Sequence, residues 1–490
     1  MTDAGVDPNP EVVSSSLRWS GATVVVARFL ILARGLLLAR LVGPQAFGIV
    51  AGVVAFTTIC TTVAEVGLGS YLTHRGHKAR TDAPRVTRLG IVTGVLGTVT
   101  LAALAVPIGR LYDGDSSSVV ALALAPTVLA GVVVLVVSGL LRAEFRFRVL
   151  AVAEIGAAAT GLVVGVGLAV TGADTWALVA AVLASQVIQL GVVVGAAELA
   201  LHRRPAAGVE LRPAVRFGWK VAAGGAVWTV ALQADNAIVG GVLGASALGL
   251  YAFAYTYGTL PGLLVGSSVG QVAFPVFAHR RDQGTTPDRD FREFVRLTAT
   301  LILPLTAIGV ALTRPAVELV LGDAWRGAIE PLRWLLVVGA LRGLFPTDEL
   351  LRSVGRTDVE LRIGLVAAPA VVVAALVGTI WSIEAVALGI LVVLAGCGTA
   401  NVLVATRLSG VHSTPVLLDT LRPALLAALA GAAAAATAHA IGGPDAIVLV
   451  AAGTVGILIY LVAVRVFARP SWEALMTLVT HRHLTTAEPA

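Results

Sequence analysis

The chain contains 490 residues, of which 57% are hydrophobic and 13% are charged, and its mean hydropathy is +0.89. Soluble globular domains carry about twice that share of charged residues, so a soluble fold is a weak alternative. The net charge of +6 belongs mostly to loops between apolar stretches. It therefore gives no argument for nucleic-acid binding.

Apolar runs of about 20 residues match the hydrocarbon thickness of a bilayer when they are helical. The alternation of apolar and polar residues over about 10 positions, which a membrane β-barrel needs, is absent. We expect an all-α polytopic membrane protein with fourteen transmembrane helices. The expected spans are 17–42, 45–72, 86–110, 118–141, 148–171, 174–201, 216–243, 246–277, 290–313, 327–353, 358–380, 383–407, 418–441 and 445–468.

Lysine and arginine residues fall in alternate gaps between these spans. Of the 35, 27 lie in one set of gaps and in the tails, whereas Arg110, Arg314 and Arg326 lie in the opposite set. Cytoplasmic loops retain positive charge, so we expect a multi-pass protein of the cell membrane with both termini cytoplasmic. The first sixteen residues lack Lys and Arg, and the first span is longer than the apolar core of a signal peptide. We therefore expect no cleaved leader.

The chain repeats itself at an offset of 201 residues. LVGPQAFGI at 41–49 aligns with VLGASALGL at 242–250, so that Gly43 matches Gly244 and Gly48 matches Gly249. We interpret these glycines as tight turns and close helix packing, because glycine tolerates a positive φ and lets backbones approach each other.

Each repeat holds six spans, so the halves are related by an axis along the membrane normal, and transporters with parallel repeats place the substrate between the halves. The predicted parts are a cytoplasmic tail (1–16), a first lobe (17–201), a linker (202–215), a second lobe (216–407), two further helices (418–468) and a cytoplasmic tail (469–490).

Several stretches resemble Wzx-type polysaccharide flippases. LARLVGPQAFGIVAGVVAF at 38–56 and AEVGLGSYL at 64–72 are similar to the first two helices of that family. ADNAIVGGVLGASALGLYAFAYTYGTLPG at 234–262 and VAFPVFAHRRD at 272–282 are similar to its seventh and eighth helices. LGDAWRGAIEPLRWL and SVGRTD are similar to its tenth-helix region, and the resemblance spans most of residues 15–410.

This resemblance implies membership of the multidrug, oligosaccharidyl-lipid and polysaccharide exporter superfamily, with two six-helix lobes facing a central cavity and two extra helices. Such proteins move undecaprenyl- or dolichyl-linked sugars from the cytoplasmic to the outer leaflet. The implied partners are a lipid-linked oligosaccharide, membrane lipids, and the polymerase and glycosyltransferases of the same pathway.

Five arginines lie inside apolar stretches, away from the charged loops: Arg28, Arg34, Arg40, Arg333 and Arg342. A charge at the centre of a span costs about 2.5–3.5 kcal/mol on insertion scales. Snorkelling to the headgroups explains Arg40 well and Arg333 partly. Because guanidinium binds phosphate oxygens bidentately, we assign Arg28, Arg34 and Arg342 to a substrate cavity. An internal ion pair is an equal alternative for each.

Acidic residues are fewer in the spans. The repeat offset places Asp235, beside Asn236, at the position equivalent to Arg34, so the two charges are a candidate pair that a substrate anion would break. Asp235 pairing within its own lobe is the alternative. We assign Asn236 to substrate binding. Glu65 is a candidate for titration or cation binding, and a structural partnership with an arginine or a helix end ranks above that role.

Other patterns are weak signals for chemistry. Asp288-Arg289-Asp290 and Asp113-Gly114-Asp115 lie in loops too short for a nucleotide-binding domain. No Walker sequence, disulfide framework or metal-ligand spacing is present, so we expect neither a cofactor nor enzymatic activity. The GxxxG of Gly161 and Gly165 indicates intramolecular packing.

The expected function is that of a secondary transporter that flips a polyprenyl-linked oligosaccharide. A drug or cation exporter of the same fold would favour an acidic cavity, whereas deep arginines here outnumber deep carboxylates. A polysaccharide polymerase or ligase usually displays a large external loop, and here the longest external segment has about thirteen residues. A scaffold role leaves the five arginines unexplained.

Overall fold

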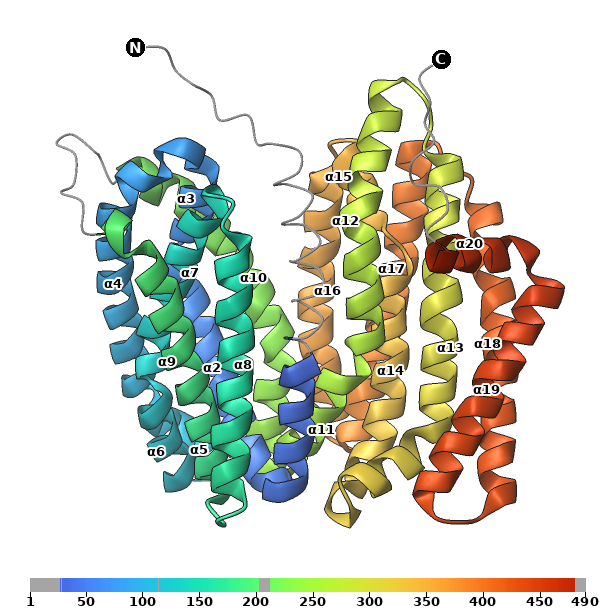
Figure 1. Cartoon of the computed structure of the whole chain (residues 1–490), viewed down its shortest axis with the longest axis horizontal. Helices are drawn as coiled ribbons and strands as arrows, with labels where there is room; N and C mark the ends of the chain where they lie inside the picture. Colours follow the sequence, from blue (N-terminus) through green and yellow to red (C-terminus); the bar gives the residue numbers. More distant parts are fainter. Residues whose placement is uncertain (1–26, 28, 113, 202–211, 481–490) are drawn as a thin grey trace. The chain divides into compact units, whose positions relative to one another are not determined.

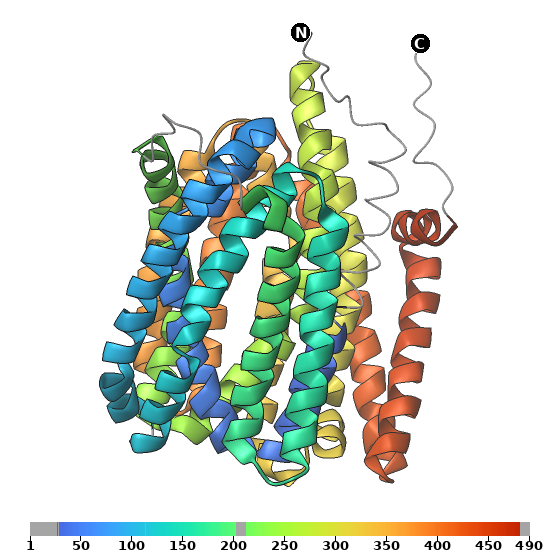
Figure 2. The same cartoon turned by 60° about the vertical axis from the view of Figure 1, so that its left-hand side comes forward.

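The computed structural model describes residues 27, 29–112, 114–201 and 212–480, except for some side chains within helices. Throughout these residues the chain forms helices joined by short turns, and no strand occurs (Figure 1). This confirms the predicted all-α membrane fold. Figure 2 shows that the first helices, in blue and green, run roughly parallel to one another.

The helices follow the predicted order. After a helix over residues 29–42 they are α2 (Pro44–Glu65), α3 (Leu68–Arg75), α4 (Ala79–Ala103), α5 (Ala105–Tyr112), α6 (Asp115–Leu124), α7 (Pro126–Ala143), α8 (Phe147–Ala169), α9 (Asp174–Leu201), α10 (Arg212–Leu243), α11 (Ala245–Gly258), α12 (Leu260–Asp282), α13 (Asp288–Val320), the 3₁₀ helix η2 (Asp323–Ala328), α14 (Ile329–Leu344), α15 (Thr347–Ser353), α16 (Thr357–Gly378), α17 (Ile383–Ser409), α18 (Ser413–Ile441), α19 (Asp445–Phe467) and α20 (Arg469–Thr480).

Within the described residues, eleven helical segments are long and apolar enough to cross a membrane. The other three predicted spans are not among these segments. The span at 17–42 lies largely outside the described residues, and so do several side chains of α10. The span at 327–353 is interrupted at Phe345 and Pro346. The count of fourteen is therefore approximate.

The glycines of the repeat behave as predicted. Gly43 precedes α2 with a φ of 82°, and Gly244 precedes α11 with a φ of 87°. Residues with a Cβ rarely adopt a positive φ. Glycine therefore occupies the turn before the second helix of each repeat. Gly161 and Gly165 both face residues of α9 in the same chain, which confirms intramolecular packing for that motif.

The described residues form two compact units, Met1–Gly249 and Leu250–Ala490. In the first unit α2 is central and packs on α4, α6, α7, α9 and α10. In the second unit α13 is central and packs on α12, α14, α18 and α19. The predicted division into lobes at 202–215 stays a prediction.

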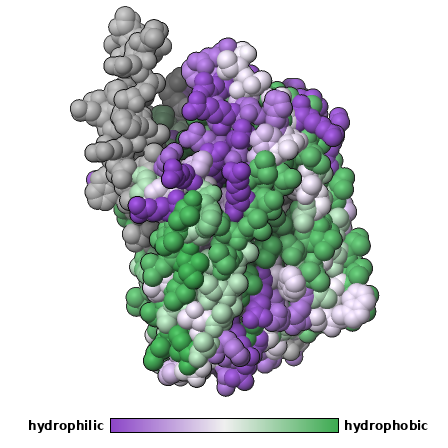
Figure 3. All heavy atoms as spheres, turned by 90° about the vertical axis from the view of Figure 1, so that its right-hand side faces the viewer, coloured by the Kyte–Doolittle hydropathy of each residue, from purple (hydrophilic) through white to green (hydrophobic). Residues whose placement is uncertain are grey.

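The outer surfaces of the helices are apolar, as lipid contact requires. Figure 3 shows a broad hydrophobic band between hydrophilic ends on one face of the molecule. On α18 and α19 the side chains of Leu425, Val450 and Val462 are all exposed. Exposed apolar surface of this extent would be unfavourable in water and is favourable in a bilayer.

Candidate functional site

Arg34 contacts α8 and α9 of the first unit. Its Nη1 donates a hydrogen bond to Ser185 Oγ of α9 over 2.8 Å, and its side chain is half-buried. A Cβ at Gly161 of α8 would lie 2.6 Å from this Nη1. The absence of a side chain at Gly161 therefore makes the room that the guanidinium occupies. Arg34 thus packs against α8 and α9.

Two further polar side chains, Thr61 of α2 and Gln186 of α9, lie beside a glycine of α7. A Cβ at Gly131 of α7 would lie 3.0 Å from Thr61 Cγ2 and 3.8 Å from Gln186 Nε2, so both side chains approach this glycine. We call Arg34, Ser185, Gln186 and Thr61 the Arg34 set. Four polar groups from three helices give the interior of this unit hydrogen-bonding capacity and one positive charge.

Asp235 and Asn236 of α10 belong to the same unit. Asp235 is 2% exposed, and its Oδ1 accepts a hydrogen bond from the backbone N–H of Asn236 over 2.8 Å. Asn236 Oδ1 is buried, and no donor among the described residues reaches it. A buried acceptor without a donor is costly, so Asn236 is suited to a ligand that supplies one. The assignment of Asn236 to substrate binding stays a prediction.

The remaining arginines have different surroundings. In the second unit Arg342 Nη1 donates to Tyr255 Oη over 2.9 Å, and the Arg342 side chain is exposed. Arg333 forms an ion pair with Glu330 one turn earlier, over 2.5 Å. Arg40 is exposed at the end of its helix, and Arg28 lies outside the described residues.

Sequence reasoning missed the hydrogen-bonding partners of both arginines. Ser185 is a single serine in an apolar helix, and Tyr255 lies in the aromatic stretch of α11. Their polarity inside an apolar span was the one signal in the sequence, because polar residues in such spans usually face the bundle interior. Helix pairing was needed to join these residues to Arg34 and Arg342.

Glu65 stabilises a break between α2 and α3. Val66 and Gly67 both adopt positive φ, of 50° and 68°, which interrupts the helix. The Glu65 carboxylate accepts hydrogen bonds from the backbone N–H of Gly67 over 2.8 Å and of Gly69 over 2.5 Å. These are N–H groups at the start of α3, which a helix leaves without partners. The contacts match the structural alternative, a helix-end partner.

We expect Glu65→Ala to destabilise the protein by about 1–3 kcal/mol, because two backbone donors in the break lose their acceptor. Glu65→Gln keeps an acceptor oxygen and should cost less than half of that. Thermal unfolding in detergent measures both. Equal losses for the two variants would instead indicate that the negative charge of Glu65 matters.

A second close contact in this unit joins the two repeats. A Cβ at Gly48 would lie 1.8 Å from the carbonyl oxygen of Ala245, and a Cβ at Gly249 would lie 1.9 Å from that of Pro44. Pro44 and Ala245 are themselves equivalent at the repeat offset of 201. The contact is therefore reciprocal, each glycine lying on the carbonyl at the start of the other helix. The predicted close packing of these glycines is confirmed.

Comparison with known proteins identifies the family. Residues 37–330 match the model of a family described as polysaccharide biosynthesis protein. The chain belongs to this family. The match covers more than half of the chain, including Thr61, Ser185, Gln186, Asp235 and the glycine contact, and it begins three residues after Arg34. The resemblance to Wzx-type flippases that the motifs indicated is confirmed.

Two curated relatives carry related names. The lipopolysaccharide biosynthesis protein WzxC of Escherichia coli (strain K12) is 23% identical over 72% of this chain and 72% of its own length. The teichuronic acid biosynthesis protein TuaB of Bacillus subtilis (strain 168) is 33% identical over 125 residues. That alignment spans 25% of this chain and only 26% of TuaB.

Solved structures support the fold. The structure of the lipid II flippase MurJ in an inward closed conformation superposes with a TM-score of 0.75, over 92% of this chain and 99% of that chain. The sequences are only 12% identical, so this likeness concerns the fold alone. It confirms that the chain has the helical fold of that flippase.

Proposed function

We propose that this protein flips a polyprenyl-phosphate- or polyprenyl-pyrophosphate-linked oligosaccharide across the cytoplasmic membrane by alternating access, for the synthesis of a surface polysaccharide or glycoconjugate. Family membership and the names of WzxC, TuaB and MurJ support this class of substrate. The observation that carries the proposal is Arg34, a guanidinium in the predicted first membrane span that packs against α8 and donates to Ser185 of α9.

The chemistry of the Arg34 set fits this substrate. The phosphate linkage must cross a region of low dielectric constant, where an anion needs a compensating charge. Guanidinium remains charged at all relevant pH values and presents paired donors to phosphate oxygens. Thr61 and Gln186 add neutral hydrogen-bonding groups of the kind that sugar hydroxyls use. Arg342 with Tyr255 supplies a second such donor group in the second unit.

The rival drug or cation exporter is less well supported. A cationic substrate needs available carboxylates, and Glu65 already accepts two backbone hydrogen bonds in the break between α2 and α3. The chain would act with glycosyltransferases and a polymerase of the same pathway. Both termini would face the cytoplasm, because the loops rich in arginine lie on that side.

Depletion of the protein in its own cell tests the function. We expect lipid-linked oligosaccharide to accumulate with its sugar in the cytoplasmic leaflet, inaccessible to a glycosidase added outside spheroplasts. Restored expression should make the sugar accessible again. Unchanged accessibility on depletion, with no accumulation, would contradict the proposal.

We further propose that Arg34 and Asp235 form an ion pair during the transport cycle that the substrate anion breaks. Either Arg34→Asp or Asp235→Arg alone should reduce oligosaccharide flipping at least about tenfold, because each leaves like charges facing each other in a region of low dielectric constant. The double exchange should restore flipping to within a few-fold of the native rate. A double variant as inactive as the single variants would refute the pair.

A further inference from the structure

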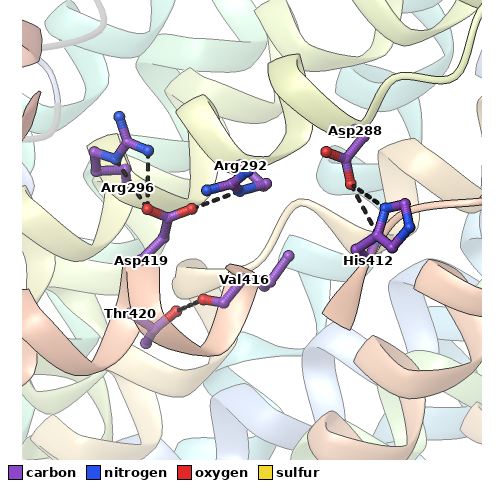
Figure 4. Close-up of polar contacts among 7 residues, drawn as sticks. All are labelled: Asp288, Arg292, Arg296, His412, Val416, Asp419 and Thr420. Atoms are coloured by element: carbon purple, nitrogen blue, oxygen red, sulfur yellow. Dashed lines mark hydrogen bonds and ion pairs between the residues drawn. The ribbon is translucent and has the colours of Figure 1, made fainter. Parts of the chain in front are cut away.

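Two arginines of α13 share one carboxylate of α18. Arg292 Nε donates to Asp419 Oδ2 over 2.8 Å (Figure 4). Arg296, one turn further along α13, donates to Asp419 Oδ1 through Nε over 3.2 Å and through Nη2 over 2.8 Å. The three side chains are 32%, 24% and 13% exposed, in the order Arg292, Arg296 and Asp419. We call these residues the Asp419 cluster.

The Asp419 cluster has more positive charge than its own contacts neutralise. Two guanidinium groups against one carboxylate leave one positive charge. Among the contacts of the described residues, both Nη groups of Arg292 and Nη1 of Arg296 have no acceptor. Asp419 thus fixes the orientation of two guanidinium groups while leaving donors available on both.

Two other ion pairs between neighbouring helices join one arginine to one aspartate. Arg75 Nε lies 2.6 Å from Asp82 Oδ2, which ties α3 to α4. Arg280 Nε lies 2.7 Å from Asp290 Oδ2, which ties α12 to α13 at the corresponding place in the second repeat. One arginine per aspartate is enough to join two helices there. Glu144 and Asp358 also each lie near two arginines, but those arginine side chains are 37–77% exposed. The Asp419 cluster differs because both of its arginines are more buried than these.

The depth of the cluster fits the headgroup layer. α13 has 33 residues, which corresponds to about 50 Å of helix and exceeds the 40–45 Å of a bilayer with its headgroups. Arg292 and Arg296 lie about 6 and 12 Å from the start of α13. Beside Asp419 on α18, the side chains of Leu417 and Leu421 are 64% and 46% exposed, as expected for lipid contact.

We propose that the Asp419 cluster binds the phosphate group of a membrane lipid in the leaflet at the end of α13 that we assign to the cytoplasm. The paired donors of guanidinium match phosphate oxygens, and a lipid phosphate neutralises the remaining charge. The phosphate belongs either to an ordinary anionic phospholipid or to a polyprenyl phosphate carrier. The site shares no residue with the Arg34 set and does not depend on which substrate is flipped.

Lipid binding to the purified full-length protein tests this site. The test variant is Arg292→Gln with Arg296→Gln and Asp419→Asn, which keeps hydrogen-bonding side chains and leaves no buried charge unpaired. Its matched control is Arg280→Gln with Asp290→Asn, which removes a balanced pair at the same end. Native mass spectrometry follows the titration of each protein with dioleoyl phosphatidylglycerol, dioleoyl phosphatidylcholine or undecaprenyl phosphate.

We expect the native protein and the control to retain an anionic lipid at least about tenfold more tightly than the test variant, the effect of losing charge-assisted hydrogen bonds. Preference for phosphatidylglycerol would identify a phospholipid, whereas displacement by equimolar undecaprenyl phosphate would identify the carrier. Thermal unfolding verifies that the test variant is folded. Equal retention of both anionic lipids by the folded test variant and the native protein would overturn the proposal.

Discussion

Replacement of Gly48 by valine is expected to abolish transport or reduce it at least about hundredfold. Even a Cβ at this position would lie 1.8 Å from the carbonyl oxygen of Ala245 and 2.7 Å from the amide nitrogen of Gly249. Both are backbone atoms and cannot move aside as a flexible side chain would. The helices α2 and α11 would have to separate, at a cost of about 3 kcal/mol or more.

The matched control for this variant is Gly167→Val. Gly167 lies in α8, also in a span, and no atom lies within 4 Å of a Cβ placed there. We expect Gly167→Val to keep near-native transport and stability. The measurements are oligosaccharide flipping and the melting temperature of both variants. A Gly48→Val protein as active and as stable as Gly167→Val would show that close approach at Gly48 is not required.

Replacement of Arg34 by glutamine is expected to reduce flipping of a lipid-linked oligosaccharide by about two orders of magnitude. This corresponds to about 3 kcal/mol for the loss of the guanidinium charge beside the substrate phosphate in a region of low dielectric constant. Arg34→Lys should lose about tenfold, because lysine keeps the charge without the paired donors. Ser185→Ala should also lose several-fold, because the hydrogen bond that orients Arg34 disappears.

Arg40→Gln is the control for Arg34→Gln, because Arg40 is exposed at the end of the same helix. It should retain at least about half of native flipping, as snorkelling arginines usually contribute little. The comparison uses the initial rate of flipping at equal protein content. If Arg34→Gln and Arg40→Gln lost activity equally, a special role for Arg34 would be excluded.

Much of the fold could be predicted from the sequence because apolar length and turn residues are local properties. Gly43 and Gly244 fall at the turns where a positive φ is required, and most predicted spans correspond to observed helices. The breaks within spans were missed. The one after Glu65 depends on Val66 in a left-handed conformation, which β-branched residues rarely adopt. The Glu65 carboxylate and its backbone hydrogen bonds stabilise it.

The candidate site was predictable only in part. The free-energy cost of placing a charged side chain in an apolar span identified Arg34 and Arg342 as residues that need polar surroundings. Their partners Ser185 and Tyr255 lie 151 and 87 positions away, so the partnerships depend on helix packing. The same holds for Asp419, which lies 127 positions from Arg292. Sequence periodicity identifies a polar residue in an apolar helix, whereas tertiary structure decides what it contacts.

Reconstitution of the purified protein in liposomes tests the central claim most directly. A fluorescent lipid-linked oligosaccharide is placed in both leaflets, and a glycosidase outside the vesicles reports how much substrate becomes accessible. We predict complete digestion with the native protein, and digestion limited to about half with Arg34→Gln over the same period. Digestion limited to half with the folded native protein would contradict the account.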